Sequence, residues 1–301
     1  MARKTAIHFI RIIRRSAQHH GFCIVAEKKT AQVLRAFFKY LLYRLQLAPL
    51  LHRVLFWLAK QQQRKQNNLY HQAYPGLVIP PDTFIYETYQ LDYRKFIADG
   101  EVAAQEIINW TKPYLTNTDS KILDWGCGVG RIIRHLPGIV PTAQLYGADA
   151  NEAMIDWNKT HYPGITFTTI HSFPPTPYAP DFFDLVYGFS VLTHIDASAQ
   201  QAWIEELHRI LRPGGVLLLT THGTNYTQQL RLSEKRQLSA NGIYTRQYPQ
   251  QGHRMMTSWH QPFLFRQMLT PYFEVREMYE GKEHPQKAGG HDLWILQKKV
   301  I

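Results

Sequence analysis

Cysteine is scarce in this sequence, and long uncharged apolar runs are absent. The 301 residues include 2 cysteines, Cys23 and Cys127, which excludes a disulfide scaffold and is typical of a reducing compartment. The most apolar region, 33–59, is interrupted by several basic residues and Pro49, whereas a membrane-spanning helix needs about 20 apolar residues. Residues 1–15 lack the unbroken apolar stretch of a secretory signal. We therefore expect a cytoplasmic protein without a spanning helix.

Acidic residues are almost missing from the first part of the chain. Residues 1–66 carry 14 Lys and Arg and one acid, Glu27, for a net charge of +13, whereas residues 67–301 carry 20 basic and 22 acidic groups, for a net charge of −2. Leu and Phe residues within 33–45 recur at the spacing of one helix face, with basic residues opposite. We therefore consider an anionic membrane surface as a partner of residues 1–65, and a peripheral location for the protein. A helical cap that packs on the rest of the chain fits the same pattern.

A linker is indicated by three prolines and a glycine within Tyr74–Asp82. We predict a basic helical N-terminal extension with its linker over residues 1–82 and a second domain over residues 83–301. In the second domain, short apolar strands alternate with helices of about ten residues, which predicts a parallel sheet covered on both faces. The predicted strands are Lys121–Trp125, Gln144–Asp149, Ile165–Ile170, Phe183–Phe189, Gly215–Thr221, Phe273–Tyr279 and Asp292–Lys298. The segment Tyr226–Trp259 shows no clear strand or helix, and we expect it to influence substrate choice.

A glycine-rich turn, Gly126–Gly130, follows the first predicted strand. Its alternate glycines let the backbone turn sharply and approach a ligand without Cβ obstruction, and a helix predicted over 131–136 would offer its N-terminal amides. Asp124 lies just before the turn, where its carboxylate can meet an ammonium group. Asp149 ends the next strand, where it can accept both ribose hydroxyl protons. A nucleoside with a cationic amino-acid tail fits this pattern better than a dinucleotide does.

Four stretches occur in a characteristic order: ILDWGCGVGR, LYGADANEAM, DFFDLVYGFSVLTHI and LHRILRPGGVLLLT. Together they resemble the motifs of the class I S-adenosylmethionine-dependent methyltransferases, and the resemblance covers residues 86–299. It implies an α/β fold with a doubly wound, seven-stranded, mostly parallel sheet in the order 3-2-1-4-5-7-6, with the last strand antiparallel and helices on both faces. It also implies S-adenosyl-L-methionine as the cofactor.

The resemblance assigns cofactor-binding roles motif by motif. Asp124 and the glycines would hold the methionine part, Asp149 the ribose, and Ala150 and Met154 the adenine, although Met154 is equally compatible with core packing. Where the family often has an acidic residue after the third strand, this chain has His171-Ser172-Phe173. The predicted cofactor-binding set is Asp124, Gly126, Cys127, Gly128, Gly130, Asp149, Ala150, Met154, Ser172, Phe173 and Phe189.

His194, just beyond the fourth predicted strand, is the candidate catalytic residue. A histidine there can remove a proton from a substrate hydroxyl at neutral pH. The alternative is that His194 only anchors a loop, because orientation of the reactants can supply much of the catalysis in a methyl transfer. The histidines show no zinc-ligand spacing with cysteine partners, so we expect no metal.

These observations leave three hypotheses about function. The first is a methyltransferase that acts on oxygen or nitrogen of a small-molecule, sugar or lipid-linked acceptor. The second is an RNA methyltransferase that holds nucleic acid with the basic N-terminal segment. Against the second, residues 188–191 read Gly-Phe-Ser-Val instead of the Asn/Asp-Pro-Pro-aromatic run of similar enzymes that act on base amino groups. The third is a binding module with a vestigial pocket, which the intact acidic and glycine motifs argue against.

Overall fold

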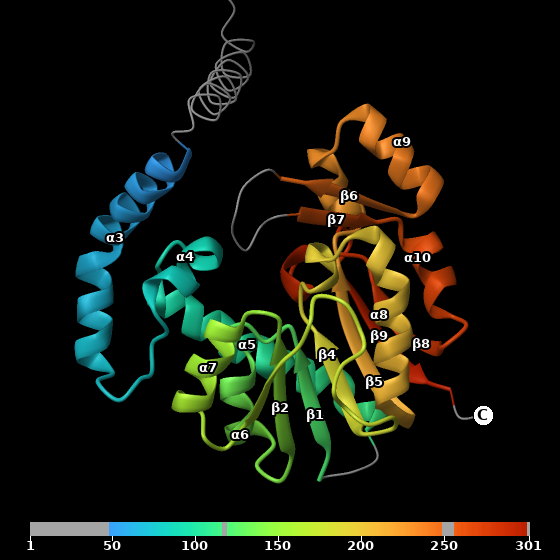
Figure 1. Cartoon of the computed structure of the whole chain (residues 1–301), viewed down its shortest axis with the longest axis horizontal. Coiled ribbons are helices and arrows are strands. Elements are labelled where there is room, and N and C mark those ends of the chain that lie inside the picture. Colours follow the sequence, from blue (N-terminus) through green and yellow to red (C-terminus); the bar gives the residue numbers. More distant parts are fainter. Residues whose placement is uncertain (1–47, 116–118, 249–255, 300–301) are drawn as a thin grey trace, which may run out of the picture. The chain divides into compact units, whose positions relative to one another are not determined.

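The structure is a computed structural model, and it describes residues 48–115, 119–248 and 256–299. The chain divides into two units, Met1–Lys65 and Gln66–Ile301. Helix α3 (Ala48–Ala73) begins in the first unit and ends in the second. It runs through the polar residues 61–68 and ends at Ala73, directly before the predicted linker segment Tyr74–Asp82 (Figure 1). The helix predicted over 33–45 lies outside the described residues.

Seven strands of the second unit form one sheet, in the order β3-β2-β1-β4-β5-β9-β8. Strand β9 pairs antiparallel with both of its neighbours, and the other pairings are parallel. The predicted fold class and strand order are therefore confirmed. The strands are β1 (Lys121–Trp125), β2 (Gln144–Asp149), β3 (Thr166–Thr169), β4 (Phe183–Gly188), β5 (Leu211–Thr221), β8 (Phe273–Tyr279) and β9 (Asp292–Lys298).

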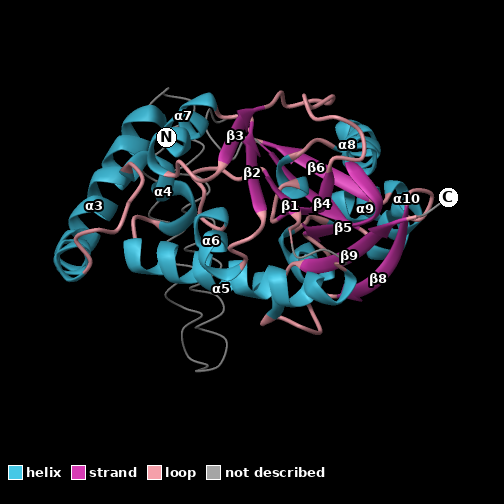
Figure 2. Cartoon of the chain, turned by 90° about the horizontal axis from the view of Figure 1, so that it is seen from below, coloured by secondary structure: helices cyan, strands magenta, loops and turns pink. Residues whose placement is uncertain are grey.

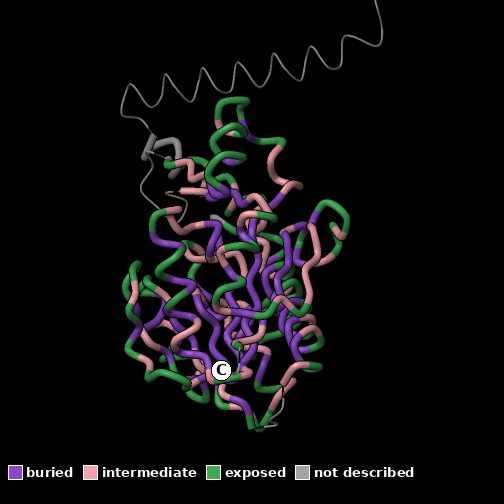
Figure 3. The backbone as a smooth tube through the Cα atoms, turned by 90° about the vertical axis from the view of Figure 1, so that its right-hand side faces the viewer, coloured by how far each residue is buried: buried purple, intermediate pink, exposed green. Residues whose placement is uncertain are grey.

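Both faces of the sheet are buried, because successive residues of each central strand enter different cores (Figures 2 and 3). Leu123 packs in a core with α8 and α10, whereas its neighbour Ile122 packs in a core with α5 and α7. The longer helices of this unit after α3 are α4 (Asp82–Tyr89), α5 (Tyr93–Thr111), α7 (Glu152–His161), α8 (Ala197–Ile210), α9 (Leu232–Asn241) and α10 (Pro262–Leu269). Among the described residues, no helix has the length and apolar character needed to cross a membrane.

The prediction of a helix over 131–136 is wrong. The chain forms turns there, followed by the 3-10 helix η2 (Ile133–His135) and the four-residue helix α6 (Leu136–Ile139). Close packing against α5 gives a physical reason, since a Cβ added at Gly100 would lie 2.3 Å from the main-chain oxygen of Arg131. Helix α5 itself is continuous from Tyr93 to Thr111 and passes through Gly100.

The described parts of the segment Tyr226–Trp259, residues 226–248 and 256–259, contain regular structure, contrary to our expectation. After the 3-10 helix η4 (Thr224–Gln229) come helix α9 and an antiparallel hairpin of β6 (Ile243–Gln247) and β7 (Met256–His260). The hairpin is stabilised by a buried tryptophan, Trp259, whose ring lies 5.0 Å from the Arg246 guanidinium. Arg246 also pairs with Glu234 of α9 at 2.5 Å.

Candidate functional site

One edge of the sheet collects the sequence motifs. The carboxyl ends of β1, β2, β4 and β5 meet there because these strands are parallel. The amino end of β9 reaches the same edge, since Asp292 pairs with Thr221 at the end of β5. In open α/β sheets, ligands bind outside the carboxyl ends of the strands. The edge is therefore the candidate binding site.

The glycine-rich turn is held against the end of β2. The main-chain N–H groups of Gly126 and Cys127 both donate to the Ala148 carbonyl oxygen, at 2.7 and 3.0 Å. Gly126 has a φ of +76°, and a Cβ there would lie 2.5 Å from Cγ2 of Val191. Only glycine combines that backbone conformation with this close approach.

Asp149 lies at the end of β2 with its carboxylate turned toward the glycine-rich turn. One carboxylate oxygen accepts the Gly128 N–H at 2.9 Å, and the other accepts the Asn151 N–H at 2.8 Å. A carboxylate offers about four lone-pair positions, so two positions are left for hydroxyl donors of a ligand. A Cβ added at Gly128 would meet only the Met154 sulfur, at 4.0 Å. The backbone at this point is therefore open to a ligand, and the free acceptor positions of Asp149 fit the two hydroxyl donors of a ribose.

Asp124 lies in β1 just before the turn, and its side chain is buried. Burial raises the pKa of Asp124 to about 7, although the Tyr187 hydroxyl and the Arg131 guanidinium oppose the rise. A cationic ligand near this carboxyl would favour its ionised form. Burial also raises the pKa of the neighbouring Cys127 thiol well above its ordinary value, which is typical of an unreactive structural cysteine.

The other predicted cofactor residues differ in how far they are buried. Met154 is buried in α7, whose N-cap Asn151 accepts the Met154 N–H at 3.2 Å. Ala150 and Ser172 are exposed, and Phe173 is 61% exposed. The Ser172 carbonyl accepts a hydrogen bond from the Trp203 indole, so this carbonyl already has a partner.

Sequence reasoning missed Asn158, which supports the turn from α7. Its side-chain amide donates to the Gly128 carbonyl oxygen at 2.7 Å. The residue is fully buried. Its place six residues after the Glu that begins α7 carried no sequence signal, because the contact depends on how α7 packs on the turn.

Phe189 and His194 follow β4 at the same edge. Phe189 is half-buried, and the Arg131 guanidinium lies 5.8 Å from the centre of its ring. His194 ends the 3-10 helix η3 (Leu192–His194), and its Nδ1 lies 3.4 Å from the Met256 carbonyl oxygen of β7. Phe189 therefore lies near the residue that follows the glycine-rich turn, and His194 lies against β7.

Four rings form a cluster that sequence reasoning did not identify: Phe189, His222, Tyr226 and His291. The His222 and Tyr226 rings stack with their centres 4.2 Å apart, and the His222 and His291 rings meet at 4.7 Å. The Phe189 ring lies nearly parallel to that of His291 at 6.2 Å. His222 follows β5 and His291 precedes β9, so only the antiparallel pairing of these strands brings the two histidines together.

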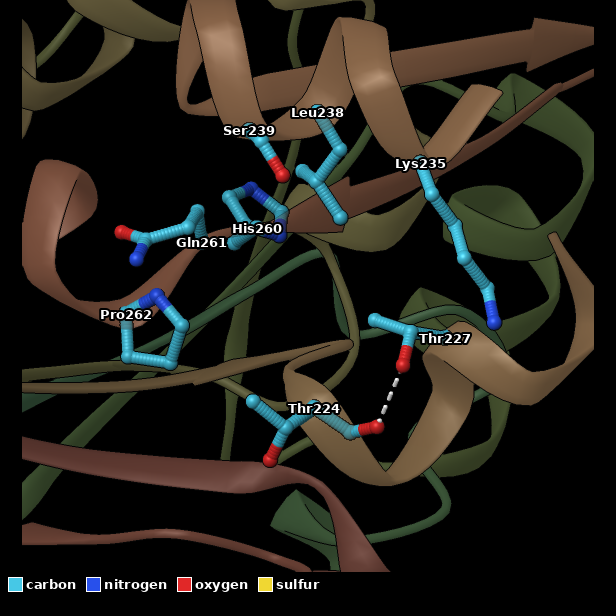
Figure 4. A pocket seen from close by; sticks show the side chains of 8 residues that line it. All are labelled: Thr224, Thr227, Lys235, Leu238, Ser239, His260, Gln261 and Pro262. Atoms are coloured by element: carbon cyan, nitrogen blue, oxygen red, sulfur yellow. Dashed lines mark hydrogen bonds between the residues drawn. The ribbon is translucent and has the colours of Figure 1, made fainter. Parts of the chain in front are cut away.

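A cavity of about 210 Å³ lies between η4, α9 and the end of β7 (Figure 4). Its lining residues are Thr224, Thr227, Lys235, Leu238, Ser239, His260, Gln261 and Pro262. None of the residues predicted to bind the cofactor lines it. Within the part of the chain that the structure describes, no group of three or more His, Cys, Asp or Glu side chains is arranged to hold a metal ion. The expectation that no metal is needed stays a prediction.

Comparison with known proteins points to one family. Residues 122–215 match the family model described as a methyltransferase domain. The chain is 31% identical over 101 residues to malonyl-[acyl-carrier protein] O-methyltransferase of Hahella chejuensis, which covers 33% of this chain and 36% of that protein. It is 28% identical over 155 residues to the human tRNA N(3)-cytidine methyltransferase METTL2B, which covers 48% of this chain and 39% of that protein. The chain thus matches less than half the length of these relatives.

Solved structures show the same fold. A SAM-dependent methyltransferase of Methanosarcina mazei superposes with a TM-score of 0.50 at 22% identity, over 64% of this chain and 98% of that chain. DesVI of Streptomyces venezuelae superposes with a TM-score of 0.50 at 17% identity, over 71% of this chain and 98% of that chain.

Proposed function

We propose that this chain, which carries a methyltransferase domain on the class I fold, transfers a methyl group from S-adenosyl-L-methionine to oxygen or nitrogen of a small-molecule, sugar or lipid-linked acceptor. The observation that carries this proposal is the Asp149 carboxylate, which holds the glycine-rich turn and keeps lone pairs for two hydroxyl donors. The family match over 122–215 supports it. We take the methyltransferase region to be residues 83–301 and the extension to be residues 1–82.

The residues of the turn would bind and orient the cofactor. Asp149 would accept the ribose hydroxyl protons, and the buried Asp124 carboxyl would favour a nearby ammonium group. Met154 would contact the adenine through its polarizable sulfur. When bound, S-adenosylmethionine supplies a methyl group on a sulfonium sulfur, which reacts by in-line displacement. The task of the protein is then to hold the acceptor atom in line with that methyl group.

His194 is the residue that we propose as a general base for the acceptor. Its Nδ1 faces a carbonyl oxygen, which can only accept, so the neutral tautomer with the proton on Nδ1 fits best and Nε2 is the basic nitrogen. A base role predicts that His194→Ala lowers kcat by about 100-fold or more and changes its pH profile, with KM less affected. A change confined to KM would indicate that His194 only positions the loop.

The experiment that tests the function is a transfer assay with S-adenosylmethionine carrying a labelled methyl group. Purified full-length protein is incubated with separate pools of sugars, phenols, lipids and RNA, and labelled product is recovered from each pool. Label in a small-molecule or lipid pool supports the proposal. Label in RNA alone would replace it with the second hypothesis below.

RNA methylation is the second candidate function. The observations that favour it are the +13 net charge of residues 1–66 and the similarity to a protein named as a tRNA N(3)-cytidine methyltransferase. Residues 67–301, with a net charge of −2, give no further attraction for phosphate. We therefore rank it below the small-molecule proposal.

An anionic membrane surface is the partner that we propose for residues 1–65. In α3, Val54, Leu55, Trp57 and Leu58 are each 46–57% exposed, and the same helix carries Arg53, Lys60, Arg64 and Lys65. Exposed apolar side chains next to basic ones are the composition of an interfacial helix.

Vesicle binding tests the membrane proposal. The full-length protein should sediment with vesicles that contain phosphatidylglycerol but not with pure phosphatidylcholine, and added salt should weaken binding, because screening acts within about 10 Å at 0.1 M. The double variant Trp57→Ser/Leu58→Ser should bind less. The control Leu232→Ser removes a leucine that is 77% exposed elsewhere in the chain. An equal loss of vesicle binding in the double variant and in the control would contradict the membrane proposal.

A further inference from the structure

We propose that the ring cluster of Phe189, His222, Tyr226 and His291 binds the methyl acceptor, and that this acceptor is an uncharged ring with an apolar face and a hydroxyl group. The inference rests on the proposed function and narrows it, since it excludes carboxylate and polyphosphate acceptors. An aromatic ring and a sugar ring are two sources of the same chemistry, and the experiment below separates them.

The cluster begins beside the proposed cofactor-binding turn. Arg131 directly follows Gly130, and its guanidinium lies over the Phe189 ring. Phe189 in turn lies parallel to His291. At the same point the Ser190 N–H donates to the Thr220 hydroxyl at 2.7 Å, which ties the end of β4 to the end of β5. A ligand on these rings would therefore lie next to the cofactor that we propose the turn binds.

The rings are fixed in place yet retain exposed surface. The Tyr226 hydroxyl donates to the Gly289 carbonyl oxygen at 3.0 Å, and the Asn225 amide donates to the Gly290 carbonyl oxygen at 3.1 Å. These bonds tie η4 to the 3-10 helix η5 (Lys287–Gly290) that leads into His291. All four side chains of the cluster are partly exposed, although the strands beside them are buried. Rigid rings with accessible surface suit a ligand ring that has an apolar face.

The two imidazoles of the cluster carry no positive charge at neutral pH. Burial, with a smaller contribution from nearby histidines, lowers the pKa of His222 to about 2 and that of His291 to about 4. The guanidinium over Phe189, that of Arg131, already interacts with the buried Asp124 carboxyl and donates to the Asp99 carbonyl oxygen. The acidic groups nearby add negative charge: Asp292 follows His291, and the Glu280 carboxylate accepts the Thr224 hydroxyl. An anionic acceptor on the His222 and His291 rings would therefore be desolvated beside uncharged imidazoles, and the cation at the Phe189 end, Arg131, is already shared with Asp124.

The imidazoles can nevertheless bind a hydroxyl. Nδ1 of His222 and Nδ1 of His291 are buried and have no hydrogen-bond partner among the described residues. A buried polar atom without a partner is costly, and a ligand donor that reaches it by a small ring rotation would remove that cost. In the transfer, the methyl carbon–sulfur bond breaks with its electron pair left on sulfur, and the new carbon–oxygen bond forms. The hydroxyl proton leaves to water or to His194.

A matched pair of probes tests the charge preference. Full-length protein saturated with S-adenosylhomocysteine is titrated in a calorimeter with 2-naphthol and with 2-naphthoate, which share one ring system and differ in charge. We expect 2-naphthol to bind at least about tenfold more tightly. Equal or tighter binding of 2-naphthoate would overturn the proposal. Methyl glucopyranoside forms the sugar arm: binding of the glucoside in place of 2-naphthol supports the proposal with a sugar as the source, and binding of neither overturns it.

Variants test whether the cluster is the binding surface. Tyr226→Ala should weaken 2-naphthol, or the glucoside if that is the probe that binds, by about three- to tenfold, because one ring contact is lost. His222→Phe keeps a ring and removes the nitrogens, so it tests the hydroxyl contact and should also weaken binding. Phe263→Ala removes a ring that is 64% exposed on α10 and should have no effect. Unchanged binding in both cluster variants would contradict the proposal.

Titration with S-adenosylhomocysteine separates this proposal from the proposed function. Each cluster variant should bind S-adenosylhomocysteine as the wild type does, which also shows that it is folded. Wild-type protein that fails to bind S-adenosylhomocysteine would contradict the proposed function itself. Normal cofactor binding with no probe preference would contradict only the inference about the acceptor.

Discussion

Replacing Asp149 by asparagine removes one negative charge at the point where we place the ribose. The wild-type carboxylate accepts two main-chain N–H groups, from Gly128 at 2.9 Å and from Asn151 at 2.8 Å. An asparagine can accept with only one side-chain oxygen, so one of these N–H groups would face the amide nitrogen. The substitution therefore weakens the ligand contact and the support of the turn together.

The expected effect follows from the strength of a hydrogen bond to a charged group. Loss of one such bond costs about 1.5–3 kcal/mol, which corresponds to a rise in Kd of roughly 10- to 150-fold. Calorimetric titration with S-adenosylmethionine measures this directly. Asp149→Ala, which removes both oxygens, should weaken binding at least as much.

A matched control is Asp156→Asn in α7. The Asp156 side chain is 63% exposed and pairs with Lys159 at 3.4 Å on the surface, so its loss should leave Kd unchanged. If Asp149→Asn binds S-adenosylmethionine as tightly as the wild type and the control do, the assignment of the ribose to this carboxylate is refuted.

Three further predictions concern stability and metal dependence. Because burial raises the pKa of Asp124 from 3.8 to about 7, the unfolded chain loses this proton at lower pH than the folded chain, so the contribution of Asp124 to stability falls as pH rises through that interval. Denaturant unfolding at several pH values should show a flatter profile for Asp124→Asn, and an unchanged slope would contradict the burial argument. Gly223→Ala should destabilise the protein by about 2 kcal/mol or more, because the new Cβ would lie 1.7 Å from an Asp292 carboxylate oxygen. In the control Gly138→Ala the new Cβ meets nothing within 4 Å, so this variant should be tolerated. Similar unfolding midpoints for the two variants would contradict the close packing at Gly223. Methyl transfer should proceed at the same rate with and without a chelator, and a strict requirement for a divalent ion would show that the metal prediction is wrong.

The strands were predictable because they are buried on both faces. Four of the seven predicted strands, including Lys121–Trp125 and Asp292–Lys298, have the observed bounds. A strand covered on both faces is a short apolar run between polar turns, which is visible without any periodicity. The hairpin of β6 and β7 has no such signal: it is short and rich in polar residues, and it depends on the buried Trp259 and on the Arg246–Glu234 pair.

Only those residues of the candidate site that lie close to one another in the sequence were predictable. The glycine-rich turn and Asp149 are separated by one helix–strand unit, and a known motif spacing connects them. The ring cluster joins His222 to His291, which are far apart in the chain. The strand order implied by the family resemblance would place the start of the last strand beside the end of the fifth, and that is the signal that could have found the pair. Side-chain packing, as in the contact of Asn158 with the turn, has no counterpart in a sequence pattern.

The most direct test of the central claim is a binding competition between S-adenosylmethionine and NADH on the full-length protein. The glycine spacing and the two carboxylates, Asp124 and Asp149, predict that S-adenosylmethionine binds and that NADH does not displace it, because a buried carboxyl next to the turn disfavours a pyrophosphate. Calorimetric titration with each ligand alone, followed by titration of S-adenosylmethionine in the presence of NADH, gives the answer. Tighter binding of NADH than of S-adenosylmethionine would contradict the account.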